Sequence, residues 1–170
     1  MRGFALAMHA ENVKIRGDYA AGTCTRMICP RNVDGLLIEN VTVEGFAIGG
    51  AVALMNCRRT TVTGCTLRDF YTNLDWGGGG ISQATGIEID NDVIAGTVSQ
   101  GVHIVDNDIH HFEDGPVTVA ADSYQSDGIN IHRGTGHIIS GNYITHVADG
   151  IDNFASGCVV SGNVVEDIFV

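Results

Sequence analysis

The chain has 170 residues, the length of one domain, and its composition of 44% hydrophobic and 17% charged residues excludes an intrinsically disordered protein. Its net charge of −11, with only nine Lys and Arg residues, argues against nucleic acid and against an anionic membrane as a partner. No apolar run approaches the roughly 20 residues of a membrane-spanning helix. The opening MRGFALAMHAENVKIRG has no signal-peptide pattern. We therefore expect residues 1–170 to form a single domain.

A nine-residue repeat organises the chain. Its copies are IENVTVEGF from Ile38, VTGCTLRDF from Val62, IVDNDIHHF from Ile104, ISGNYITHV from Ile139 and VSGNVVEDI from Val160. Positions one, six and nine are always apolar, and positions three and four are Asn, Gly, Asp or Cys with one Val. The copies start 24, 42, 35 and 21 residues apart. We interpret 42 as two coils of 21 and 35 as one coil with an insertion, and we expect Ile15 to start an earlier coil.

Short alternating runs of β-branched residues at this period predict a β-solenoid. Its last full unit would contain the strands INIH, HIIS and YITHV, with one face of each strand filling the interior. Asn107, Asn142 and Asn163 share one turn position, where stacked amides can hydrogen-bond along the solenoid axis. About seven coils at roughly 4.8 Å each would make a rod on the order of 35 Å long.

The repeat resembles the right-handed parallel β-helix of the pectate-lyase-like superfamily, most clearly over Ile38–Val170. The alternative is a left-handed hexapeptide helix, because GIEIDNDVIAGTVSQ has some period-six character. The spacing of 21 to 24 residues and the Asn-rich turns favour the right-handed form. The register of residues 71–103 stays open, because IDNDVIAGT also fits the repeat but starts only 15 residues before Ile104.

The last strand, VVEDIFV, is apolar, and no capping helix is legible at either end. A solenoid end without a cap is an open template for strand pairing. We expect a fragment of a longer solenoid, or ends covered by a partner such as a second copy.

Two insertions follow the same repeat position, YTNLDWGGGG after Phe70 and EDGPVTVAADSYQSD after Phe112. Long loops at one corner of a solenoid usually build one functional face. Here they would flank the strands ISQ from Ile81, INIH from Ile129 and IDNF from Ile151. In the superfamily that the chain resembles, this face forms the carbohydrate groove.

Within this face, Asn130 and His132 are expected to point outward, with Asp152 beside Asn130 and Phe154 beside His132. Trp76, Asp122 and Tyr124, together with Tyr71 and Asp75, would rim the groove. Aromatic rings and carboxylates suit sugar binding. The alternative is that Trp76 and Tyr124 only anchor their loops.

Asp127 and Asp149 are the leading catalytic candidates, because SDGIN and ADGID lie one coil of 22 residues apart. The charges of two carboxylates on adjacent strands interact, which raises the pKa of one group above that of the other and provides an acid and a base. Glycoside hydrolysis needs such a pair. QSDGIN resembles the Asn-Thr-Asp-Gly stretch of polygalacturonases, which places Asp127 on its Asp. Asp149 falls on the second residue of that family's Asp-Asp pair, whose first residue is Ala148 here. The alternative is that Asp-Gly is only a turn signal.

His132 is a second catalytic candidate. DGINIH resembles the Tyr-Gly-x-Asp-Pro-His motif of mannuronan C5-epimerases, with Gly128 and His132 matching. This resemblance implies His132 as the base and Arg133 as the partner of a uronate carboxylate. The alternative is a surface histidine.

Five cysteines without a CxxC pair do not predict a zinc site, so we expect no cofactor. Calcium is the alternative, with Asp75, Asp106, Asp108, Asp122 and Asp127 as oxygen ligands.

The sequence thus predicts a polysaccharide-processing β-helix, a hydrolase or a uronate lyase or epimerase, at the cell exterior, on a cell surface or on a virion. Its catalytic residues would be Asp127, His132, Asp149 and Asp152, and Asn130, Arg133, Tyr124, Trp76 and Asp122 would bind substrate. The alternative function is a non-catalytic carbohydrate-binding or structural module, such as a phage tailspike shaft or an adhesin.

Overall fold

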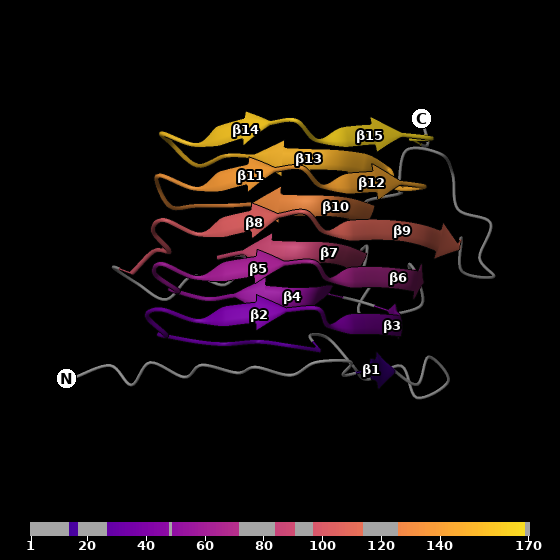
Figure 1. The fold of residues 1–170 in the computed structure, drawn as a ribbon, viewed down its shortest axis with the longest axis horizontal. Helices are drawn as coiled ribbons and strands as arrows, with labels where there is room; N and C mark the ends of the chain where they lie inside the picture. Colours follow the sequence, from indigo (N-terminus) through magenta and orange to yellow (C-terminus); the bar gives the residue numbers. More distant parts are fainter. Residues whose placement is uncertain are drawn as a thin grey trace, which may run out of the picture.

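The computed structural model describes residues 14–16, 27–47, 49–71, 84–90, 97–113 and 126–168. The secondary structure of these residues consists of β-strands, and every strand pairing among them is parallel. Within each sheet, the strands stack above one another with their chain directions aligned (Figure 1). The described residues include no helix that is long and apolar enough to cross a membrane.

Three parallel sheets form the walls of this solenoid-like fold. The six-stranded sheet contains β1 (Lys14–Arg16), β3 (Thr42–Ala47), β6 (Thr66–Tyr71), β9 (Asp108–Glu113), β12 (Tyr143–Thr145) and β15 (Val164–Glu166). The five-stranded sheet contains β2 (Leu37–Glu39), β5 (Thr61–Thr63), β8 (His103–Val105), β11 (Ile138–Ser140) and β14 (Val159–Ser161). The four-stranded sheet contains β4 (Gly49–Leu54), β7 (Ala84–Ile89), β10 (Ser126–Ile131) and β13 (Asp149–Asn153). The chain visits the sheets in turn, so each sheet gains one strand per circuit.

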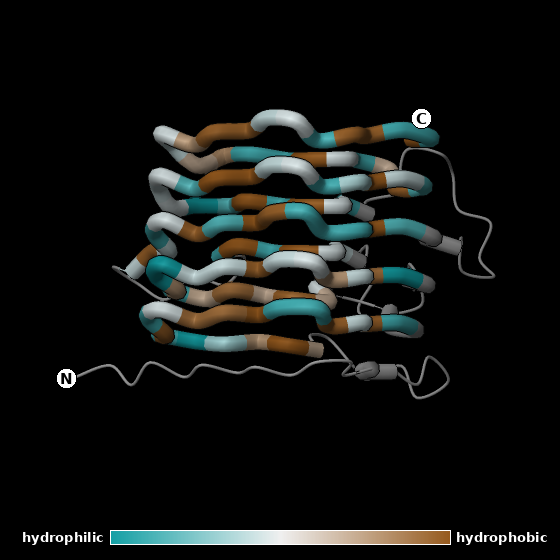
Figure 2. The backbone as a smooth tube through the Cα atoms, in the orientation of Figure 1, coloured by the Kyte–Doolittle hydropathy of each residue, from teal (hydrophilic) through white to brown (hydrophobic). Residues whose placement is uncertain are grey.

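The register of the strands confirms the repeat. Position one of every copy lies in one row across the five-stranded sheet, and position six lies in one row across the six-stranded sheet. These rows supply part of the buried core, including Val62, Ile104, Leu67, Ile109 and Ile144, all fully buried. Figure 2 shows the apolar segments of successive layers lying above one another. Alternation within short strands therefore builds one continuous interior.

Two predictions about the register are wrong. The 42 residues between Val62 and Ile104 are not two coils, because β5 pairs directly with β8 and β6 with β9. Ile15 pairs with Val43, so it occupies position six of an earlier circuit and not position one. In both cases the number of residues between copies predicts the wrong register, because strand pairing depends on which side chains face the interior.

The region whose register was open contains β7. This strand pairs with β4 on one side and with β10 on the other, with Ile87 in register with Ile129. The neighbour of INIH is therefore GIEI and not the predicted strand ISQ, whose first residue, Ile81, lies outside the described residues.

The predicted asparagine ladder is present. The side-chain oxygen of Asn142 accepts hydrogen bonds from the backbone N–H of Asn107 at 3.0 Å and from its amide at 2.9 Å. The amide of Asn142 donates to Ile104 O and to Asn163 Oδ1. Asn107 Oδ1 accepts from the N–H of Cys65, which ends the ladder. Each amide thus satisfies buried backbone groups of the next circuit, which would otherwise be costly to bury.

The strands β13, β14 and β15 form one edge of each sheet (Figure 1). Here the core positions are exposed: Val160 retains 46% and Val165 42% of its accessible surface, while their counterparts Ile139 and Ile144 are fully buried.

Replacing Asn142 by Ala should destabilise the fold by about 3 kcal/mol, because four side-chain hydrogen bonds are lost and buried partners remain. Asn163→Ala, in the half-buried last member of the ladder, should cost about 1 kcal/mol. Urea denaturation measures both free energies of unfolding. Equal costs at the two positions would contradict a ladder that depends on its buried middle member.

Candidate functional site

A row of small residues sets which side chains of the four-stranded sheet face outward. A Cβ added to Gly128 would lie 2.5 Å from Ile144 Cγ2, and one added to Gly86 would lie 2.8 Å from Ile109 Cγ2. Both glycines therefore face inward, onto the six-stranded sheet. Because Ile129 also faces inward, two consecutive residues point to the core and the alternation is interrupted.

As a result, residues three apart lie on the same outer face. The amide of Asn130 donates a hydrogen bond to Asp127 Oδ2 at 2.5 Å, which joins the two sides of Gly128. The register then places Asp149 beside Asp127 and Asp152 beside Asn130, as predicted. On the other neighbour, β7, the same positions hold Thr85 and Glu88.

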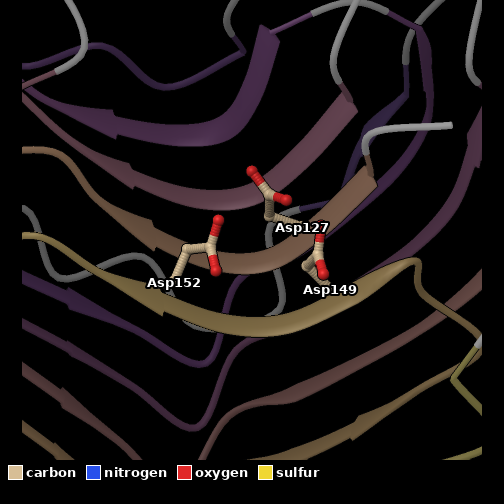
Figure 3. Close-up of side chains that lie close together, drawn as sticks. All are labelled: Asp127, Asp149 and Asp152. Atoms are coloured by element: carbon tan, nitrogen blue, oxygen red, sulfur yellow. The ribbon is translucent and has the colours of Figure 1, made fainter. Parts of the chain in front are cut away.

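The carboxylates of Asp127, Asp149 and Asp152 converge; we call these three residues the carboxylate cluster. One oxygen of each lies within 4.8 Å of the others. Figure 3 shows Asp127 on β10 and the other two on β13, with the three carboxyl groups facing the same region. Asp127 is buried, Asp152 is half-buried and Asp149 is exposed, so Asp149 is the member most accessible to solvent.

Burial raises the pKa of Asp127 to about 6, and the charges of Asp152, Asp149 and Glu88 add to this effect, while the hydrogen bond from Asn130 opposes it. Burial also raises the pKa of Asp152, together with the charge of Asp149, whereas His132 lowers it. The cluster therefore holds a carboxyl group that keeps its proton to near-neutral pH beside an exposed carboxylate.

A second buried aspartate shows what a structural role looks like. Asp90 accepts hydrogen bonds from the N–H of Asn56 at 2.6 Å, from the N–H of Ser99 and from its hydroxyl at 3.0 Å. In contrast, the one hydrogen bond seen for Asp127 among the described residues comes from Asn130. Among the described residues, Asp127 is thus buried with a single side-chain donor, and burial of a carboxylate with few donors is costly.

Asn130 has an unsatisfied atom in the same place. The residue is only 3% exposed, and its Oδ1 is buried and has no hydrogen-bond partner in the described part of the chain. Buried amide oxygens nearly always have a partner, so this atom needs an explanation.

His132 and Phe154 form an aromatic pair next to the cluster. Their ring centroids are 6.4 Å apart and their planes differ by 19°, which confirms the predicted neighbourhood. Phe154 is 69% exposed. Arg133 follows directly and is also exposed. An exposed ring two residues beyond Asp152 is available for a ligand.

Most of the other predicted site residues lie outside the part of the chain that the structure describes. Trp76, Asp122, Tyr124 and the calcium candidate Asp75 lie outside the described residues, as does the side chain of Tyr71. Asp106 and Asp108 are described, but they lie on β8's turn and on β9, away from the four-stranded sheet.

Sequence reasoning missed Glu88 and Thr85, both almost fully buried on the outer face. A signal for them exists, because TGIEI, DGINI and DGIDN share a glycine that pairing places in one row.

In the described part of the chain, Asp127, Asp149 and Asp152 are the one group of three His, Cys, Asp or Glu residues whose ligand atoms are close enough to hold a metal ion. Oxygen donors of this kind suit calcium.

Comparison of the chain with protein-family models, with curated proteins and with solved structures gives no match. The site must therefore be interpreted from its own geometry.

Replacing Asp127 by Asn should stabilise the protein by up to about 3 kcal/mol at pH 8, because a pKa raised from 3.8 to about 6 makes ionisation of the folded state costly. The folded state binds this proton more tightly than the unfolded chain. The cost therefore develops between about pH 4 and 6, is complete above about pH 7 and is absent below about pH 3.

The measurement is urea denaturation of both proteins at pH 3 to 8 in a chelating buffer. Asp149→Asn is the matched control on the next strand, and the gain there should be smaller because Asp149 is exposed. A variant that is no more stable than the parent protein at pH 8 would show that Asp127 ionises without cost.

Proposed function

We propose that this chain is a polysaccharide hydrolase built on a right-handed parallel β-helix of the pectate-lyase-like type, and that the carboxylate cluster is its active site. The observation that carries the proposal is the convergence of three carboxyl groups, one of which is buried with a pKa of about 6. The repeat and the three parallel sheets support the architecture.

Asp127 would act as the general acid. Its raised pKa keeps the proton available near neutral pH, which is what protonation of a leaving sugar oxygen requires. Asp152 and Glu88 contribute by placing negative charge nearby, which disfavours ionisation of Asp127. Asn130 would position the Asp127 carboxyl group through its hydrogen bond.

Asp149 would act as the nucleophile. Two carboxyl groups about 5 Å apart suit a retaining mechanism, whereas inversion needs about 6.5–9.5 Å to admit a water molecule. One oxygen of Asp127 lies within 4.8 Å of one oxygen of Asp149, which is compatible with the retaining arrangement. An Asp149 oxygen would bond to the anomeric carbon as the glycosidic C–O bond breaks and Asp127 protonates the leaving oxygen. Water would then hydrolyse the glycosyl ester and return a proton to Asp127.

A neutral polysaccharide, encountered outside the cell, is the substrate class that fits. Glu88, Asp149 and Asp152 share one face with Asp127, and the negative charge of these neighbours would repel a polyuronate. The exposed ring of Phe154 would stack on the apolar face of a neutral pyranose.

A uronate lyase or epimerase has less support. It would use His132 as the base and Arg133 as the carboxylate partner. His132 is half-buried against Phe154, and Arg133 lies beyond the end of β10. The cluster of carboxylates beside them would oppose binding of a uronate.

A non-catalytic carbohydrate-binding module is the second candidate. It is favoured by the exposed ring of Phe154 beside His132, which would bind a sugar without cleaving it.

Incubation with a panel of neutral and acidic polysaccharides should release new reducing ends from a neutral one, without an increase in absorbance at 232 nm. Asp127→Asn and Asp149→Asn should each lower kcat by about 10³-fold or more, since each removes a partner of the reaction. NMR of the first product should show the anomeric configuration of the substrate.

Phe154→Ala is the matched variant that separates binding from chemistry, and it should raise KM with little change in kcat. No new reducing ends on any polysaccharide would overturn the hydrolase proposal. Absorbance at 232 nm would indicate elimination, and an inverted product would refute Asp149 as the nucleophile.

A further inference from the structure

We propose that the carboxylate cluster and Asn130 Oδ1 together form a binding site for one calcium ion. This inference concerns the same residues as the proposed active site, but it rests on their geometry and does not depend on hydrolysis.

The ligand set is made only of oxygen atoms. Asp127, Asp149 and Asp152 each offer a carboxylate oxygen, and Asn130 offers an amide oxygen. Hard oxygen donors without nitrogen or sulfur suit calcium or magnesium and disfavour zinc or copper.

The number of protein ligands favours calcium over magnesium. Ca²⁺ takes about six to eight oxygen ligands, including several carboxylates and amide oxygens, whereas Mg²⁺ usually keeps several waters and takes one or two carboxylates. Two oxygens bound to one ion can be no farther apart than twice the bond length, which is about 4.6–5.2 Å for Ca²⁺. The three carboxylate oxygens lie within 4.8 Å of one another, which this limit accommodates.

Asn130 supplies the observation that is independent of the acidic residues. Its amide nitrogen is hydrogen-bonded to Asp127 and its backbone is in register with Asp152, so Asn130 is a neighbour of two members of the cluster. Its Oδ1 is buried and has no hydrogen-bond partner among the described residues. An ion at the cluster would satisfy this oxygen and would also neutralise carboxylates that repel one another.

The ion would enter from the side of Asp149, which is exposed, and water would complete the coordination there. An ion held at this position would occupy the oxygens that hydrolysis uses. If the proposed function holds, calcium should inhibit it.

Calorimetric titration of the whole protein with CaCl₂ tests the site. We expect one ion per chain, at least tenfold weaker binding of MgCl₂, and a rise in Tm with calcium. Asp149→Asn and Asp152→Asn should each weaken calcium binding at least tenfold. Asn130→Ala should also weaken calcium binding, whereas a change outside the site should not.

Asp106→Asn is the matched control, because Asp106 is an exposed aspartate on a turn away from the cluster. The calcium affinity of this variant should equal that of the parent protein. Asp149 and Asp152 are not fully buried, so their variants test the site even if Asn130→Ala fails to fold. No heat of binding and no shift in Tm at millimolar calcium would overturn the proposal, as would binding that Asp149→Asn leaves unchanged. The titration needs no polysaccharide, so its failure leaves the hydrolase proposal standing, and failure to find a substrate leaves the calcium site standing.

Discussion

Parallel strands stacked in register about 4.8 Å apart make every side chain a close neighbour of its counterpart one circuit away. The effect of this constraint depends on the chemistry of the residue. Stacked asparagines stabilise the fold, because each amide can both donate a hydrogen bond to the next one and accept one from it, as Asn142 does. Stacked aspartates destabilise it, because the charges of Asp127 and Asp149 repel each other. The geometry that stabilises the turns thus creates the electrostatic cost at the proposed site.

The inward-facing glycines determine which residues meet there. Had the strand alternated regularly, Asp127 and Asn130 would lie on opposite faces. The close approach of Gly128 to Ile144 leaves no room for a side chain and brings the two residues together. The same interruption at Gly150 allows Asp149 and Asp152 to share a face. Packing between two sheets, and not the residues of the cluster alone, therefore builds the site.

Much of the architecture could be predicted from the sequence, because the apolar positions of the nine-residue repeat coincide with the interior. The asparagine ladder, the pairing of Asp127 with Asp149 and of Asn130 with Asp152, and the contact of His132 with Phe154 all follow from that register. The 42-residue interval was misinterpreted because sequence spacing does not distinguish an extra coil from an insertion within one. Glu88 was missed because its strand could not be placed without knowing this pairing.

Two buried aspartates differ in their surroundings. Asp90 accepts three hydrogen bonds, whereas Asp127 lies beside other carboxylates and has a single amide donor among the described residues. NMR titration of the aspartate side-chain carbons in metal-free protein, with Asp127 assigned by comparison with Asp127→Asn, measures the consequence directly. Asp127 should titrate with a pKa of about 6, because burial and the neighbouring carboxylates disfavour its ionisation. A pKa near 4, the value of an ordinary aspartate, would contradict the proposed role of Asp127 as the general acid.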